Sequence, residues 1–159
     1  MAALLHPGKA SVLLDQNETI VACNASWSAL CGYTLSQVKG KRTTILQGPN
    51  TNLKKASQFA IDTRTKGAAK TILCNYDSDG QPFAHRLEAK RITDLNTGST
   101  FYVVEGETVS DPAIHRAILN QEPVKRSDRE LAWAVESVEM VLLLAAVMSA
   151  AFVTSSTLV

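Results

Sequence analysis

Three strand-like segments follow one another in the second half of the chain and are separated only by short turns. They cover residues 70–76, 81–93 and 99–105, and the turns between them, 77–80 and 94–98, combine aspartate or asparagine with a glycine. Turns of this composition connect neighbouring antiparallel strands, because glycine accepts the positive φ that a tight reversal needs. The pattern predicts a three-stranded antiparallel meander.

A second strand pair and several helices precede the meander. Residues 11–15 and 19–23 read as a hairpin, and residues 24–32 read as a short helix with an asparagine at its start and a glycine at its end. Residues 53–66 predict a longer helix that Gly67 closes. The sequence therefore predicts an α+β chain of five strands with short helices and one longer helix.

The block between these two halves carries a family resemblance. It reads Gly40-Lys41-Arg42-Thr43-Thr44-Ile45-Leu46-Gln47-Gly48-Pro49-Asn50-Thr51. It resembles the flavin-binding core of LOV domains, the photoreceptor branch of the PAS family, which typically reads Gly-Arg-Asn-Cys-Arg-Phe-Leu-Gln-Gly-Pro. The resemblance looks closest to LOV domains of plants and photosynthetic algae. It covers roughly residues 11–109 and implies an α+β PAS fold, in which the five strands form one antiparallel sheet with short helices and one longer helix.

The same resemblance implies that most of the flavin chemistry is missing. Thr43 stands at the position of the photoactive cysteine, and a hydroxyl is far too weakly acidic to form the flavin adduct. Thr44 and Ala60 stand where two arginines hold the flavin phosphate, which removes the charge-assisted contacts to that group. At the remaining pocket positions the family residues are kept at Gln47 and Asn75 and replaced at His85 and Gly106. We expect a vestigial pocket filled by side chains, no cofactor and no photocycle.

Composition and motifs favour neither an enzyme nor a nucleic-acid binder. The formal charge is +1, without the basic excess of a nucleic-acid-binding domain. The three cysteines form no CxxC pair, so no metal site is expected. Neither a phosphate-binding glycine loop nor a nucleophile elbow occurs. We therefore expect a non-catalytic module.

The C-terminal run 140–159 contains no charged residue. A helix of this length reaches about 30 Å, the thickness of a bilayer core, so we expect a single-pass C-terminal transmembrane anchor. Trp133 is expected at the membrane interface. Small residues within the run would allow close helix packing against a partner, namely Ala145, Ser149 and Ala150. The alternative interpretation makes 128–159 a soluble dimerisation helix.

The expected organisation is an N-terminal extension (1–10), a LOV-like PAS domain (11–109), a short helix and linker (110–127) and a C-terminal helix (128–159). We expect an accessory or structural subunit of an integral membrane protein complex, in contact with membrane lipid and without a small-molecule substrate or nucleic-acid partner. A chloroplast photosystem assembly in the thylakoid is the suggested location. The alternative is a membrane-anchored sensor that binds flavin or another small ligand without adduct photochemistry.

Overall fold

The structure is a computed structural model, and it describes residues 5–120. The elements follow in the order β1 (Ala10–Leu14), β2 (Ile20–Cys23), α1 (Ala25–Cys31), α2 (Leu35–Val38), η2 (a 3-10 helix, Thr43–Leu46), α3 (Leu53–Lys66), β3 (Ala68–Tyr76), β4 (Pro82–Thr93), β5 (Thr100–Thr108) and α4 (Pro112–Leu119). The five-stranded antiparallel sheet with short helices and one longer helix, as predicted from the sequence, is confirmed.

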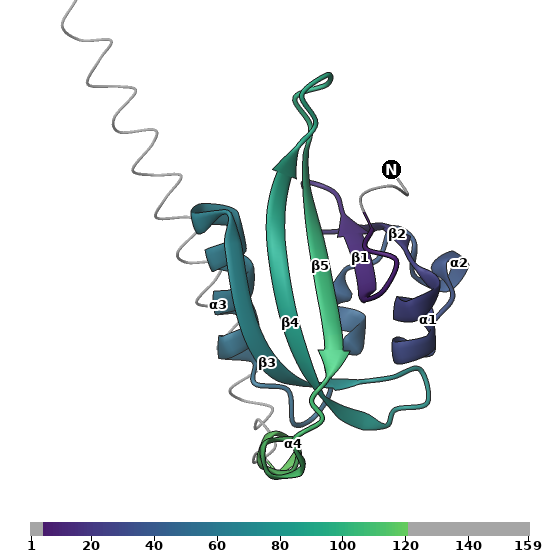
Figure 1. Cartoon of the computed structure of the whole chain (residues 1–159), viewed down its shortest axis with the longest axis vertical. Helices are drawn as coiled ribbons and strands as arrows, with labels where there is room; N and C mark the ends of the chain where they lie inside the picture. The colour runs from purple at the N-terminus through teal and green to yellow at the C-terminus, as the bar shows by residue number, and fades with distance from the viewer. Residues whose placement is uncertain (1–4, 121–159) are drawn as a thin grey trace, which may run out of the picture. The chain divides into compact units, whose positions relative to one another are not determined.

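The strands form one sheet in the order β2-β1-β5-β4-β3, with every neighbouring pair antiparallel. Figure 1 shows α3 beside β3, and α1 and α2 on the side of β1 and β2. The predicted strand ends differ from the observed ones by a few residues. The largest difference is at β5, which runs to Thr108 because it pairs with β4 on one side and with β1 on the other. Gly106 therefore lies inside a strand and not in the loop after it.

Asparagine and glycine set the ends of the two main helices. At the start of α1 the Asn24 side chain accepts a hydrogen bond from the Trp27 amide at 2.8 Å, and at the start of α3 Asn52 accepts from Lys55 at 2.9 Å. Gly32 and Gly67 end these helices with φ of 75° and 84°. These are the left-handed values that a residue with a Cβ avoids, so glycine is needed at both helix ends.

The main hydrophobic core lies between the helices and one face of β1 and β5. Trp27, Cys31, Val38 and Leu46 come from the short helices, and each is at most 4% exposed. The strands supply the rest of this core, namely Ala10, Val12, Leu14, Ile20 and Tyr102. Packing against this core fixes the short helices, which are too short to be stable alone.

The predicted membrane anchor lies in the C-terminal part of the chain, after residue 120. The run 140–159, together with Trp133, Ala145, Ser149 and Ala150, lies outside the described residues. Within residues 5–120, no helix has the length and apolar character that a bilayer crossing requires. Of the expected segment 110–127, the structure describes α4, whose first turn is capped by the Asp111 carboxylate.

Candidate functional site

Strands β3, β4 and β5 bring three of the predicted pocket positions together. Asn75 is on β3, His85 on β4 and Gly106 on β5, and the two side chains are 5% and 1% exposed. Along β4, buried His85, Leu87 and Ala89 alternate with charged residues on the opposite face. The period-two alternation of a strand therefore places His85 in the interior.

The imidazole of His85 is fixed by one hydrogen bond and one ring contact. Asn75 Nδ2 lies 3.0 Å from His85 Nδ1, and the ring centroids of Phe83 and His85 are 5.0 Å apart. An amide nitrogen can only donate, so Nδ1 accepts and the neutral ring carries its proton on Nε2. Burial lowers the pKa of His85 to about 4, because the charged form would lose its hydration. The site therefore holds a neutral histidine at neutral pH.

Gly106 is required by the position of this ring. A Cβ at residue 106 would overlap the imidazole, with Nε2 as the nearest atom. The histidine thus reaches diagonally from β4 across the backbone of β5 while it bonds Asn75 on β3. The sequence interpretation treated His85 and Gly106 as two separate departures from the family pattern, whereas the structure shows that they are in direct contact.

Two buried polar atoms of this region have no hydrogen-bond partner among the described residues. They are Nε2 of His85 and Oγ1 of Thr71. Thr71 pairs with Leu87, and Leu87 pairs with Gly106, so both atoms belong to the same part of the sheet. A buried donor without a partner costs about 1–3 kcal/mol, so the interior here retains unused hydrogen-bonding capacity.

The other predicted positions lie on separate elements. Thr43 and Thr44 form the start of η2, and Gln47 is its C-terminal cap. Thr44 is exposed, whereas Thr43 and Gln47 are half-buried. Ala60 is half-buried in α3. The residues at these four positions carry neither a thiol nor a cationic group.

The two buried cysteines, Cys31 and Cys74, are poor nucleophiles. Burial raises the pKa of the Cys31 thiol to about 12, and it also raises the pKa of Cys74. The thiolate is the reactive form, so both sulfurs stay protonated and unreactive at neutral pH. In the part of the chain from residue 5 to residue 120, no group of three or more histidine, cysteine, aspartate or glutamate side chains could hold a metal ion.

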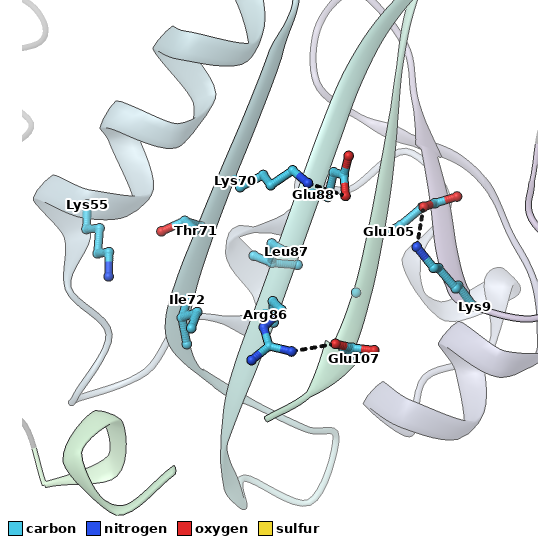
Figure 2. A pocket seen from close by; sticks show the side chains of 11 residues that line it. Lys9, Lys55, Lys70, Thr71, Ile72, Arg86, Leu87, Glu88, Glu105 and Glu107 are labelled. Carbon is cyan, nitrogen blue, oxygen red and sulfur yellow. Dashed lines mark hydrogen bonds and ion pairs between the residues drawn. The ribbon is translucent and has the colours of Figure 1, made fainter. Parts of the chain in front are cut away.

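An organised charged face was missed by sequence reasoning, which treated the charges as scattered. Ion pairs join Lys9 to Glu105 at 3.4 Å, Arg86 to Glu107 at 2.8 Å and Lys70 to Glu88 at 3.1 Å (Figure 2). These six residues line a cavity of about 450 Å³ together with Lys55, Thr71, Ile72, Leu87 and Gly106. The signal was available in the alternation Arg86-x-Glu88 and Glu105-x-Glu107, but which charges face each other depends on strand register.

Comparisons with known proteins agree with this architecture. A family model described as a PAS domain matches residues 9–110. Two curated relatives are a bacterioopsin transcriptional activator of Halobacterium salinarum, 29% identical over 56% of this chain, and a blue-light photoreceptor of Listeria innocua, 24% identical over 61% of it. The matched regions span 13% and 38% of these relatives, so the chain corresponds to only part of each.

Solved LOV domains share the fold. The light-state structure of the blue-light photoreceptor Aureochrome1 LOV has a TM-score of 0.61 at 26% identity, and the match covers 76% of this chain and 95% of that one. A LOV protein of Rhodobacter sphaeroides has a TM-score of 0.61 at 19% identity over 69% of this chain and 65% of that one, which supports the fold alone. The sheet order, the helix arrangement and the family match lead to one conclusion: the chain belongs to the PAS domain family, with a fold of the LOV type.

Proposed function

We propose that the chain is a cofactor-free, non-catalytic PAS module that acts in protein–protein interaction, as an accessory subunit of a membrane complex. The observation that carries the proposal is the contact between His85 and Gly106, secured by Asn75. According to the resemblance, positions 75, 85 and 106 would contact the flavin ring. In this structure His85 instead bonds Asn75 and packs on Gly106. A ring system bound there would have to displace a buried, hydrogen-bonded imidazole.

The chemistry of the remaining positions supports the same proposal. Thr43 offers no thiol, and the buried Cys31 and Cys74 stay protonated. Thr44 and Ala60 offer no cation to a phosphate. Adduct photochemistry needs both a nearby thiolate or thiol and a held flavin, and these positions supply neither.

Attachment to a membrane is the part of the proposal that rests on sequence alone. The uncharged run 140–159 supports it, and that run lies outside the described residues. The charged face of Figure 2 is a candidate contact surface for a partner protein, because its ion pairs are presented in register on three neighbouring strands. A location in the thylakoid membrane remains part of the proposal.

A ligand sensor is the second candidate function. The buried Nε2 of His85 and Oγ1 of Thr71 favour it, because both retain hydrogen-bonding capacity in the interior. One curated relative is named a blue-light photoreceptor, and solved LOV domains share the fold. In this reading the pocket takes a small molecule with a hydrogen-bond acceptor, and no cysteine adduct forms.

One experiment separates the two candidates. The full chain is extracted in mild detergent and separated on a native gel, and every band that contains it is analysed by mass spectrometry. Co-migration with a larger complex at fixed stoichiometry is expected for an interaction subunit. In parallel, the purified chain is mixed with flavin mononucleotide, desalted and examined for blue absorption. Retained flavin, or migration of the chain alone, would overturn the first candidate and favour the sensor.

The charged face offers a matched set of variants for the same gel. Arg86→Glu places two like charges opposite each other and should release the chain from its complex if this face is the contact surface. The exchange Arg86→Glu with Glu107→Arg keeps an ion pair but reverses it. If both variants lose co-migration with the complex, the partner contact depends on the original arrangement of the charges. If the double exchange restores co-migration, Arg86→Glu acted only by disturbing the local fold.

A further inference from the structure

Two arginines far apart in the sequence meet at one carboxylate, outside the site described above. Glu18 Oε2 lies 2.7 Å from Arg42 Nη2, and Glu18 Oε1 bonds Arg64 Nη1. Glu18 is in the turn between β1 and β2, Arg42 precedes η2 and Arg64 is in the last turn of α3. Each carboxylate oxygen therefore has its own guanidinium partner, supplied by a different element.

The turn that carries Glu18 is held by its own hydrogen bonds and by an antiparallel bridge between Thr19 and Arg42. Asp15 Oδ1 accepts hydrogen bonds from the amides of Asn17 and Thr19, both at 2.9 Å, and the Asp15 amide donates to the Thr19 carbonyl. Among residues 5–120, Glu18 is the one non-glycine residue with positive φ, at 63°. Such a conformation is uncommon for a residue with a Cβ. The backbone is thus held in an unfavourable conformation at the residue whose carboxylate is inserted between the two arginines.

The charges of this cluster do not balance. One carboxylate faces two guanidinium groups, and when Asp15 of the same turn and Lys41 beside Arg42 are also counted, one net positive charge remains. Glu18 is the most enclosed member, with its side chain 19% exposed against 53% for Arg42 and 46% for Arg64. Guanidinium groups arranged around separate oxygens of one anion are the usual way in which proteins hold carboxylates and phosphates.

We propose that Arg42 and Arg64 form a binding site for a phosphate group and that Glu18 closes this site from within by taking the place of the anion. A phosphate has more oxygens and a higher charge than a carboxylate, so it matches two guanidinium groups better than Glu18 does. The proposal goes beyond the interaction function, because it assigns a ligand class to three residues that do not line the cavity of Figure 2.

Removal of the Glu18 charge tests the proposal directly. Glu18→Gln keeps the size of the side chain, and Glu18→Gly also relieves the positive φ, so at least one of the two is expected to fold as the parent does. Binding of inorganic phosphate to the full chain in detergent is measured by thermal shift and by ³¹P line broadening, with chloride at matched ionic strength as reference. We expect Glu18→Gln to bind phosphate about tenfold more tightly than the parent chain.

Two further variants make the result specific. Glu105→Gln releases Lys9 from an ion pair elsewhere on the surface and should give no gain in phosphate binding, because a single lysine is freed. Adding Arg64→Gln to Glu18→Gln should abolish the gain. Equal gains in Glu18→Gln and Glu105→Gln, or a gain that survives Arg64→Gln, would overturn the site.

The source of the phosphate group is resolved by a second probe. Vesicles that contain phosphatidic acid present the same group on a lipid, and their binding to the Glu18→Gln chain is compared with that of inorganic phosphate. A gain for inorganic phosphate assigns the site to a soluble phosphate compound. A gain for the vesicles alone assigns it to a lipid headgroup. No gain with either probe overturns the proposal.

Discussion

The imidazole of His85 lies directly on the backbone of Gly106, in space that any other residue at position 106 would fill with its Cβ. The two residues are on adjacent strands and are offset by two residues along the ladder, since Gly106 pairs with Leu87 and His85 pairs with Thr108. Because Gly106 has no side chain, the imidazole of His85 on β4 can be buried against the backbone of β5.

Gly106→Ala should destabilise the chain by about 1–3 kcal/mol, because the added methyl group overlaps the His85 ring in a packed interior. In the background of His85→Ala the same substitution should cost at least about 1 kcal/mol less, which is the coupling expected for residues in contact. Urea denaturation of the four proteins measures this difference. Gly80→Ala is the control: it lies at φ 76° with open space around it, so its cost should be the same with and without His85.

Stability should fall between pH 6.5 and pH 4, in part because of His85. Burial lowers its pKa to about 4, so in this range the unfolded chain binds a proton that the folded chain does not. The free energy of unfolding then rises with pH and is lower at pH 4 by up to about 3 kcal/mol from this group. Denaturation curves across this range should show a shallower slope for His85→Asn. The exposed His6→Gln is the control, and an unchanged slope in His85→Asn would contradict the prediction.

Asn50 should hold the end of α4. Its side-chain Nδ2 donates to the Leu119 carbonyl at 2.9 Å, while its backbone N–H donates to the Tyr76 hydroxyl at 3.0 Å. Asn50→Ala removes the first bond and leaves the second, so we expect faster amide exchange in α4 and a loss of about 1 kcal/mol. Hydrogen exchange by mass spectrometry measures the effect. Asn96→Ala, at an exposed position of the β4–β5 turn, should leave α4 unchanged.

Truncation of two leucines should affect stability to very different extents. Leu13 is fully buried in β1, whereas Leu95 is 95% exposed at the β4–β5 turn. Leu13→Ala should cost about 2–5 kcal/mol through lost burial and the cavity left behind. Leu95→Ala should change stability by less than about 0.5 kcal/mol. If Leu95→Ala removes co-migration with a complex while stability is kept, the β4–β5 turn is part of the partner contact.

Local sequence signals were sufficient for the elements of this fold. Turn residues marked both ends of β4, asparagine and glycine marked the ends of α1 and α3, and the boundaries of α3 agree with those predicted. These signals act over a few residues, because capping and positive φ are properties of the local backbone. The block 40–51 resembles LOV domains, and this resemblance predicted the PAS fold with its single sheet.

The contacts of the sites were decided by strand register and by loops that meet across the fold. The sequence identified His85 and Gly106 one at a time, but only the pairing of β4 with β5 brings the ring onto the glycine. Likewise Glu18, Arg42 and Arg64 lie far apart in the sequence, and no local pattern connects them. The burial and lowered pKa of His85, and the ion pairs of Arg42 and Arg64 with Glu18, all depend on such long-range contacts. The sequence by itself determined which elements form and which family they belong to, and the tertiary structure decided which side chains meet, because those meetings depend on register and packing between distant segments.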